Sequence, residues 1–163
     1  MDTYKGSGVS PGIGLGKFYV INNEIDFSIP KKLSFKESQK KLDKRYKQLI
    51  SELEKENRQD ESEVLDAYRL IVNDPEIIEM VDDGQNLQEI FQAFKDTSDQ
   101  MLSIEDDYFK QRAEDIISIG KEIIFTMQDI VIDKNFTEDV IIFAKELTPN
   151  DTCLLYTSPS PRD

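Results

Sequence analysis

The stretch that decides the fold is DDYFKQRAEDIISIGKEIIFTMQDI, residues 106–130. Apolar side chains recur in it at alternating spacings of four and three residues, which is the repeat of one face of an α-helix. Acidic residues at 105–107 suit the positive end of a helix dipole, so we expect the helix to begin around Ser103. The apolar face comprises Phe109, Ala113, Ile116, Gly120, Ile123, Met127 and Ile130.

Three earlier segments carry a similar pattern and predict helices that pack against this one. The first starts at Ser34, which can form a capping box with Glu37. The second follows the polar stretch 56–61, and residues 73–75, Asn-Asp-Pro, end it and can start a further helical turn. The third has apolar residues between 87 and 102. The first two segments present Leu42, Tyr46, Leu49, Leu53, Val64, Leu65, Tyr68, Ile71 and Val72.

Two short apolar segments flank the helices and predict strands. Residues 17–21, KFYVI, are rich in aromatic and β-branched side chains. Residues 140–144, VIIFA, form a continuous apolar run that predicts a buried strand of a parallel sheet. Since two strands are too few for an independent sheet, the predicted fold is mainly α, with a helical domain inserted into an incomplete α/β domain. We expect residues 147–151 to be a loop that enters a helix.

The composition excludes several classes of partner. The chain of 163 residues has 20 Lys and Arg against 33 Asp and Glu, a net charge of −13. This balance excludes nucleic acid and anionic membrane surfaces and favours basic partners. We expect no membrane insertion, because no apolar stretch is long enough to span a bilayer. The single Cys and the lack of a signal-peptide pattern predict a cytoplasmic protein, and Cys153 receives no role.

The absence of histidine excludes every catalytic or metal site that needs an imidazole. The glycine-rich start, residues 6–16, matches neither the Walker phosphate loop nor the dinucleotide fingerprint. A phosphate-binding enzyme that uses this segment remains a weak alternative. Residues 82–84, Asp-Asp-Gly, lack the ligand spacing of a calcium loop. The sequence therefore predicts no catalytic residue, no metal site and no cofactor in this chain.

Four segments, in the same order, resemble enzyme I of the bacterial sugar phosphotransferase system, the phosphoenolpyruvate–protein phosphotransferase. They are GVSPGIG at 8–14, DAY to NDPE at 66–76, DDYFKQRAEDI to GK at 106–121, and ELTPNDT at 146–152. The resemblance covers about residues 6 to 152. It implies that the complete enzyme passes phosphate from phosphoenolpyruvate through its own His to the carrier protein HPr in sugar uptake.

The resemblance also implies a domain organisation. Residues 1–23 would begin a swivelling α/β domain, 24–135 would be an inserted four-helix domain that binds HPr, and 136–152 would return to the α/β domain. The family's phosphorylated His follows that return, so the chain is expected to be an N-terminal fragment without catalytic competence. Residues 153–163 have no counterpart in the family pattern and are expected to be a non-native tail. The parent would need Mg²⁺ and would form a homodimer through parts absent here.

The family's docking surface for HPr falls on the second helix and its neighbours. The resemblance implies an apolar centre with an acidic rim, which suits a basic partner. For Val64, Leu70 and Ile71, packing in the core is an equal alternative. One departure is Tyr68, where the family commonly has His. A non-enzymatic, acidic helical interaction module remains the alternative function. By position, the implied docking residues are Asp60, Val64, Tyr68, Leu70, Ile71, Glu76 and Arg112.

Overall fold

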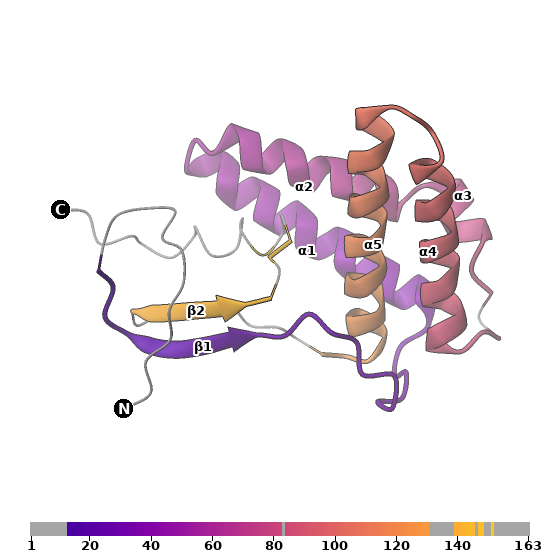
Figure 1. Cartoon of the computed structure of the whole chain (residues 1–163), viewed down its shortest axis with the longest axis horizontal. Coiled ribbons are helices and arrows are strands. Elements are labelled where there is room, and N and C mark those ends of the chain that lie inside the picture. The colour runs from indigo at the N-terminus through magenta and orange to yellow at the C-terminus, as the bar shows by residue number, and fades with distance from the viewer. Residues whose placement is uncertain (1–12, 83, 131–138, 146, 149–150, 152–163) are drawn as a thin grey trace.

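The computed structural model describes residues 13–82, 84–130, 139–145, 147, 148 and 151. Its described part is mainly helical, as predicted. Two helical pairs, α1 with α2 and α4 with α5, pack together, and a small sheet lies beside them (Figure 1). The elements in chain order are β1 (Lys17–Ile21), α1 (Phe35–Lys55), α2 (Gln59–Val72), α3 (Pro75–Glu79), α4 (Leu87–Leu102), α5 (Asp107–Met127) and β2 (Val140–Ala144).

The helices begin where side chains can satisfy free backbone N–H groups. At the start of α1, the Glu37 N–H donates to the Ser34 hydroxyl, and the Ser34 N–H donates to the Glu37 carboxylate. This confirms the predicted capping box. Asn86 and Glu89 form a second one at the start of α4, which the sequence analysis had not identified. Asp74 caps α3 ahead of Pro75, as predicted.

The two longest helices end in the same way. Asn57 follows α1 and Asp129 follows α5, and both adopt a left-handed conformation, with φ of 58° and 57°. Behind each of them the chain folds back, so that the N–H of Arg58 reaches Leu53 O and the N–H of Ile130 reaches Phe125 O. This is the Schellman arrangement, which satisfies carbonyls at a helix end and usually employs glycine. Residues 57 and 58 therefore reverse the chain, and α2 begins at Gln59.

The predicted start of α5 is wrong by several residues. Ser103 ends α4, and α5 begins at Asp107, after Asp106 has capped it by accepting a hydrogen bond from the Tyr108 N–H. The cause is that Ser103 and Asp106 are both residue types that favour helix ends, and the apolar repeat alone does not choose between them. Ile130 also lies beyond the end of α5 at Met127.

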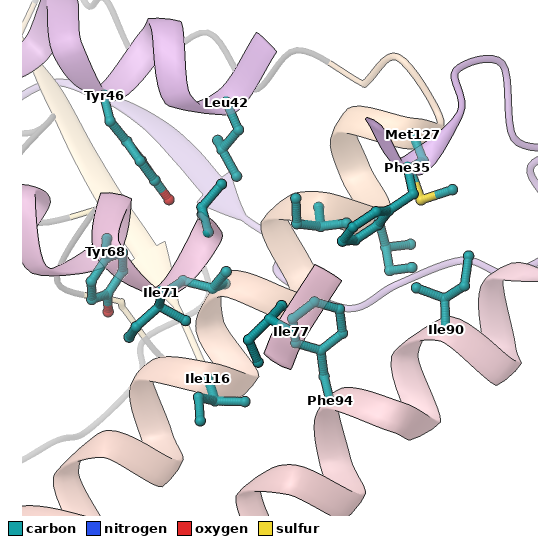
Figure 2. Packing of buried hydrophobic residues seen from close by; sticks show 14 of the residues in the cluster. Phe35, Leu42, Tyr46, Tyr68, Ile71, Ile77, Ile90, Phe94, Ile116 and Met127 are labelled. Atoms are coloured by element: carbon teal, nitrogen blue, oxygen red, sulfur yellow. The ribbon is translucent and has the colours of Figure 1, made fainter. Parts of the chain in front are cut away.

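The core forms around α5, whose apolar face meets α1, α2 and α4. Tyr46, Tyr68 and Phe94 are at most 1% exposed, and Figure 2 shows them directed into the interior from three different helices. A close contact between α4 and α5 lies at Gly120 of α5. A Cβ atom there would lie 2.8 Å from Cγ of Phe94, well inside van der Waals distance. Glycine at this position thus sets how closely α4 and α5 approach each other.

The C-terminal end of α5 holds the segment that leads from β1 to α1. The Gln128 side chain is fully buried, and its Nε2 donates to the carbonyl oxygens of Asp26, at 2.7 Å, and Ile29, at 3.0 Å. The carbonyl of Met127 accepts from the N–H groups of Lys32 and Leu33. Four hydrogen bonds therefore fix the connector 26–33 to the end of this helix.

The two strands pair in parallel, with Lys17 opposite Val140 and Ile21 opposite Ala144. The parallel pairing confirms the prediction. The predicted burial of residues 140–144 is wrong, because Phe143 is 56% exposed and none of the five residues is fully buried. An apolar strand is buried only if another layer covers it, and no described residues cover that face. Gly16 permits the close strand approach, because a Cβ there would lie 2.5 Å from Asp139 O.

Thr148 and Asp151, from the segment after β2, form reciprocal hydrogen bonds, whereas the helix expected to follow lies outside the described residues. The Thr148 N–H donates to the Asp151 carboxylate, and the Asp151 N–H donates to the Thr148 hydroxyl. The same Asp151 carboxylate accepts from the Asn23 side-chain amide at 2.8 Å. Asp151 is 2% exposed, so these partners satisfy a buried carboxylate and join the ends of the two strands.

We predict that Gly120→Ala destabilises the fold despite the better helix propensity of alanine. The propensity gain is about 1 kcal/mol, whereas overpacking against Phe94 costs roughly 1–3 kcal/mol. Urea unfolding measures the free energy difference. If the contact with Phe94 is the cause, the double variant with Phe94→Leu should recover part of the loss. A Gly120→Ala variant as stable as the parent chain would show that α4 and α5 can separate at no cost.

We also predict that Gln128→Leu lowers the free energy of unfolding by roughly 1–3 kcal/mol, because it removes two hydrogen bonds from a fully buried amide to the part-buried carbonyls of Asp26 and Ile29. The same substitution at the exposed Gln92 of α4 is the matched control and should change stability much less. Thermal and urea unfolding of both variants would test this. Equal effects of the two substitutions would contradict the role given to the Gln128 amide.

Candidate functional site

Two adjoining open grooves lie on the face formed by α2, α3, α4 and α5. The acidic groove runs between α2 and α5, has a volume of about 510 Å³, and is lined by Asp60, Glu63 and Asp115 among others. The apolar groove continues toward α3 and α4, with a volume of about 540 Å³. Tyr108 and Arg112 line both grooves, so these two side chains form the boundary between them.

All seven residues predicted for docking line these grooves. They belong to α2, α3 and α5 and are distant in sequence, yet the fold gathers them on one face. The acidic groove receives Asp60, Val64 and Tyr68, the apolar groove receives Leu70, Ile71 and Glu76, and Arg112 contributes to both.

The exposure of the apolar candidates resolves the choice between core and surface. Leu70 is 64% exposed and Val64 is 37% exposed, so their side chains are available to a partner. Ile71 is 8% exposed and belongs to the core cluster. Tyr68 is 1% exposed and packs edge-on against Tyr46, with ring centroids 6.2 Å apart. Of the four, only Leu70 and Val64 offer substantial apolar surface.

The Tyr68 hydroxyl is the unusual polar group of the acidic groove. It is buried, and its hydrogen-bonding neighbours are the Asp115 and Ser118 side chains of α5. Burial, followed by the negative charge of Asp115, raises the pKa of Tyr68 far above its ordinary value, so the hydroxyl stays protonated.

Asp115 is the charged neighbour of this hydroxyl. Its side chain is 18% exposed, and its ion pair with Arg112 is long, at 3.7 Å between Nη1 and Oδ2. Burial raises the pKa of Asp115, and the nearby Tyr68 and Arg112 side chains offset this effect only in part. At neutral pH the carboxylate is thus ionised at a cost in stability.

The boundary between the grooves is formed by a stacked pair. The Arg112 guanidinium lies 5.8 Å from the centre of the Tyr108 ring, and Tyr108 meets Phe109 edge-on. Tyr108 is 62% exposed. The sequence analysis missed Tyr108 as a site residue. Its position could have identified it. Tyr108 lies one residue before Phe109 of the apolar repeat, so this large aromatic side chain faces outward.

The apolar groove contains two methionines that the sequence analysis also missed. Met80 and Met101 line it together with Leu70 and Phe109. The Thr97 hydroxyl, which donates to the Ala93 carbonyl at 3.0 Å, also lies 3.4 Å from the Met80 sulfur, so Met80 is in contact with α4. Methionine adapts its shape to a neighbour, which suits a surface that receives another molecule.

The remaining hypotheses from the sequence concern metal binding, membrane insertion and the two ends of the chain. Within residues 13–82, 84–130, 139–145, 147, 148 and 151, no group of three or more His, Cys, Asp or Glu side chains could hold a metal ion. Over the same residues, no helix is long and apolar enough to cross a membrane. Residues 6–12 of the glycine segment, Cys153 and the proposed tail 153–163 lie outside the described residues.

The fold is that of a known class of protein domain. An NMR solution structure of the Enzyme I (nEIt) protein superposes with a TM-score of 0.68 at 23% identity, over 90% of this chain and 66% of that one. The sequence matches the family described as PEP-utilising enzyme, N-terminal, over residues 5–112. The chain belongs to this family, as the resemblance had indicated.

Three curated relatives are all named phosphoenolpyruvate-protein phosphotransferase. The phosphoenolpyruvate-protein phosphotransferase of Bacillus subtilis is 31% identical over 95% of this chain. Those of Mycoplasma genitalium and Staphylococcus carnosus are 27% and 25% identical, over 92% and 93% of this chain. The chain spans about 30% of the length of these relatives.

We predict that Asp115→Asn stabilises the fold at neutral pH. Because the pKa of Asp115 is raised on folding, the ionised form costs stability above that pKa, and the cost disappears below about pH 4, the ordinary value for Asp. The gain should be less than about 1 kcal/mol after allowance for solvent screening.

Urea unfolding of the two chains between pH 4 and 7 measures this profile. Asp99→Asn is the matched control, because it removes the same charge from an exposed position of α4 outside both grooves. A difference between Asp115→Asn and the parent chain that stays constant over this range would contradict the assigned cause.

Proposed function

We propose that this chain supplies the surface by which a phosphoenolpyruvate–protein phosphotransferase docks the carrier protein HPr. The complete enzyme would take phosphate from phosphoenolpyruvate onto a His and pass it to HPr during sugar uptake. The chain has no His. Its own contribution would therefore be recognition, and the phosphoryl-carrying His would belong to another part of the enzyme.

The observation that carries this proposal is the gathering of the implied docking residues. Residues chosen by position in α2, α3 and α5 line two adjoining grooves on one face. Five of the seven lie outside the buried core cluster, to which Tyr68 and Ile71 belong. The membership of the family supports the same function.

The chemistry of the face suits a basic partner with an apolar centre. Leu70 and Tyr108 expose apolar surface, while Asp60 and Glu63 supply negative charge at one side and Glu76 at the other. The net charge of −13 would attract a basic protein over distance and speed its association.

The remaining proposals concern the whole enzyme. Residues 24–135 would be an insertion in a swivelling α/β domain, to which 1–23 and 136–152 belong; the parallel pairing of β1 with β2 supports this arrangement. We further propose that the parent is a cytoplasmic homodimer that uses Mg²⁺. The described residues of this chain do not form a site for that ion, which other parts of the parent would hold.

A titration of the full chain with HPr of Bacillus subtilis, followed by calorimetry, tests the docking function. We expect a complex, and we expect Leu70→Ala to weaken it roughly tenfold, about 1.4 kcal/mol, because Leu70 is 64% exposed in the apolar groove and truncation removes area that a partner would bury. Leu15→Ala is the matched control, since Leu15 is 88% exposed and lies outside both grooves. It should leave the affinity unchanged.

Two outcomes would contradict the proposal. If the parent chain formed no measurable complex with HPr, the alternative of a non-enzymatic acidic interaction module would be favoured. If HPr bound and Leu70→Ala had no more effect than Leu15→Ala, docking would occur on a different face. Circular dichroism of each variant would establish that the helices remain formed.

A further inference from the structure

The apolar groove contains two of the three methionines among the described residues. Met80 caps the C-terminal end of α3 and Met101 lies in the last turn of α4, so two separate elements bring methionine side chains to one surface. Both are half-buried, whereas Met127 at the end of α5 is only 1% exposed. Because the groove is open, a small molecule in solution can reach the two methionines that line it.

A methionine thioether reacts with hydrogen peroxide and other hydroperoxides by transfer of one oxygen atom. The sulfur lone pair attacks a peroxide oxygen, and an S–O bond forms as the O–O bond breaks. The proton of the transferred hydroxyl moves to the departing hydroxide, which leaves as water. The sulfur is thereby oxidised and the peroxide reduced. The product, methionine sulfoxide, is polar where the thioether was apolar, and methionine sulfoxide reductases convert it back.

The surroundings of these methionines suit a thioether and not a sulfoxide. Apolar side chains, including Leu70 and Phe109, line the groove beside them. A sulfoxide oxygen that a partner covered would need a hydrogen-bond donor, and burial of a polar group without one costs free energy. The Thr97 hydroxyl lies 3.4 Å from the Met80 sulfur, but it also donates to the Ala93 carbonyl at 3.0 Å. Oxidation therefore penalises the covered groove more than the open one, which water can hydrate.

We propose that Met80 and Met101 form an oxidation-sensitive site that regulates docking at the apolar groove. A hydroperoxide converts both to sulfoxides, the groove becomes more polar, and the partner protein binds less tightly. Reduction of the sulfoxides restores binding. Met127 takes no part, because burial in the core shields its sulfur. This inference rests on the proposed docking function and adds the means by which that surface is regulated.

Mass spectrometry of the full chain during exposure to hydrogen peroxide tests the reaction without any partner. Trypsin places each methionine on a separate peptide, so each conversion is measured individually. We expect Met80 and Met101 to gain oxygen well before Met127 in the folded chain, and all three to react alike in urea. Equal rates for the three methionines in the folded chain would overturn the proposed site.

Calorimetric titration with HPr of Bacillus subtilis, after removal of the peroxide, tests the effect on docking. We expect the treated chain to bind at least about tenfold more weakly than the untreated chain, because each buried sulfoxide lacks a donor. Treatment with sulfoxide reductases for both epimers should reverse the loss. The double variant Met80→Leu, Met101→Leu keeps the side-chain volume nearly constant, and its affinity before and after treatment should agree. Met127→Leu is the matched control and should lose affinity on treatment as the parent chain does.

A further measurement separates a local effect from unfolding. Both methionines are only partly buried at the margin of the core cluster. Circular dichroism should therefore show the same helices before and after treatment, and urea unfolding should remain cooperative. A treated chain that had lost its helices would assign the weaker binding to unfolding and overturn the proposal.

The outcomes distinguish this inference from the docking function itself. If the untreated chain binds HPr and the chain that carries both sulfoxides binds equally well, the regulation is refuted and docking stands. If the treated double variant loses as much affinity as the treated parent chain, the effect arises elsewhere and the regulation is again refuted. If the untreated chain does not bind HPr, both fail, and the mass spectrometry still decides the reactivity of the two methionines independently.

Discussion

The close packing of α5 against α4 is the constraint on which the rest of the structure depends. Gly120 brings the α5 backbone against the Phe94 ring, and no larger residue fits there without displacement. The same helix is the wall shared by both grooves, through Tyr108 and Arg112. The geometry of the surface is therefore set by a contact in the interior, and a change of one carbon atom at Gly120 would shift groove residues that it does not touch.

The sequence carries much of this fold in its local signals. Ser34 with Glu37, and Asp74 with Pro75, specify helix starts that depend only on neighbouring residues, and both were predicted correctly. The start of α5 was predicted wrongly, since residues 103–106 offer two capping positions. Only the packing of the helices determines which of the two is used. The exposure of β2 was also unpredictable, because an apolar strand does not reveal whether another layer covers it.

The site was predictable only in part for a related reason. Positions on α2 and α3 came from the family resemblance, and the structure places them on the grooves. The approach of Asp115 to Tyr68 depends on how α2 and α5 are rotated about their axes, which an apolar repeat fixes only coarsely. Tyr108 was missed because the apolar repeat identifies the residues of α5 that face the core. A docking site is formed by the residues between them, which face outward.

Hydrogen bonds attach the 26–33 connector to the C-terminal end of α5. Residues 107–127 form one unbroken rod, with the groove wall in its first half and the Met127 and Gln128 attachments at its far end. A helix transmits axial motion without much compression. The groove wall at Tyr108 and the attachment of the connector through the carbonyls of Asp26 and Ile29 therefore belong to one continuous helix, so the same element positions the surface and the segment that leads from β1 to α1.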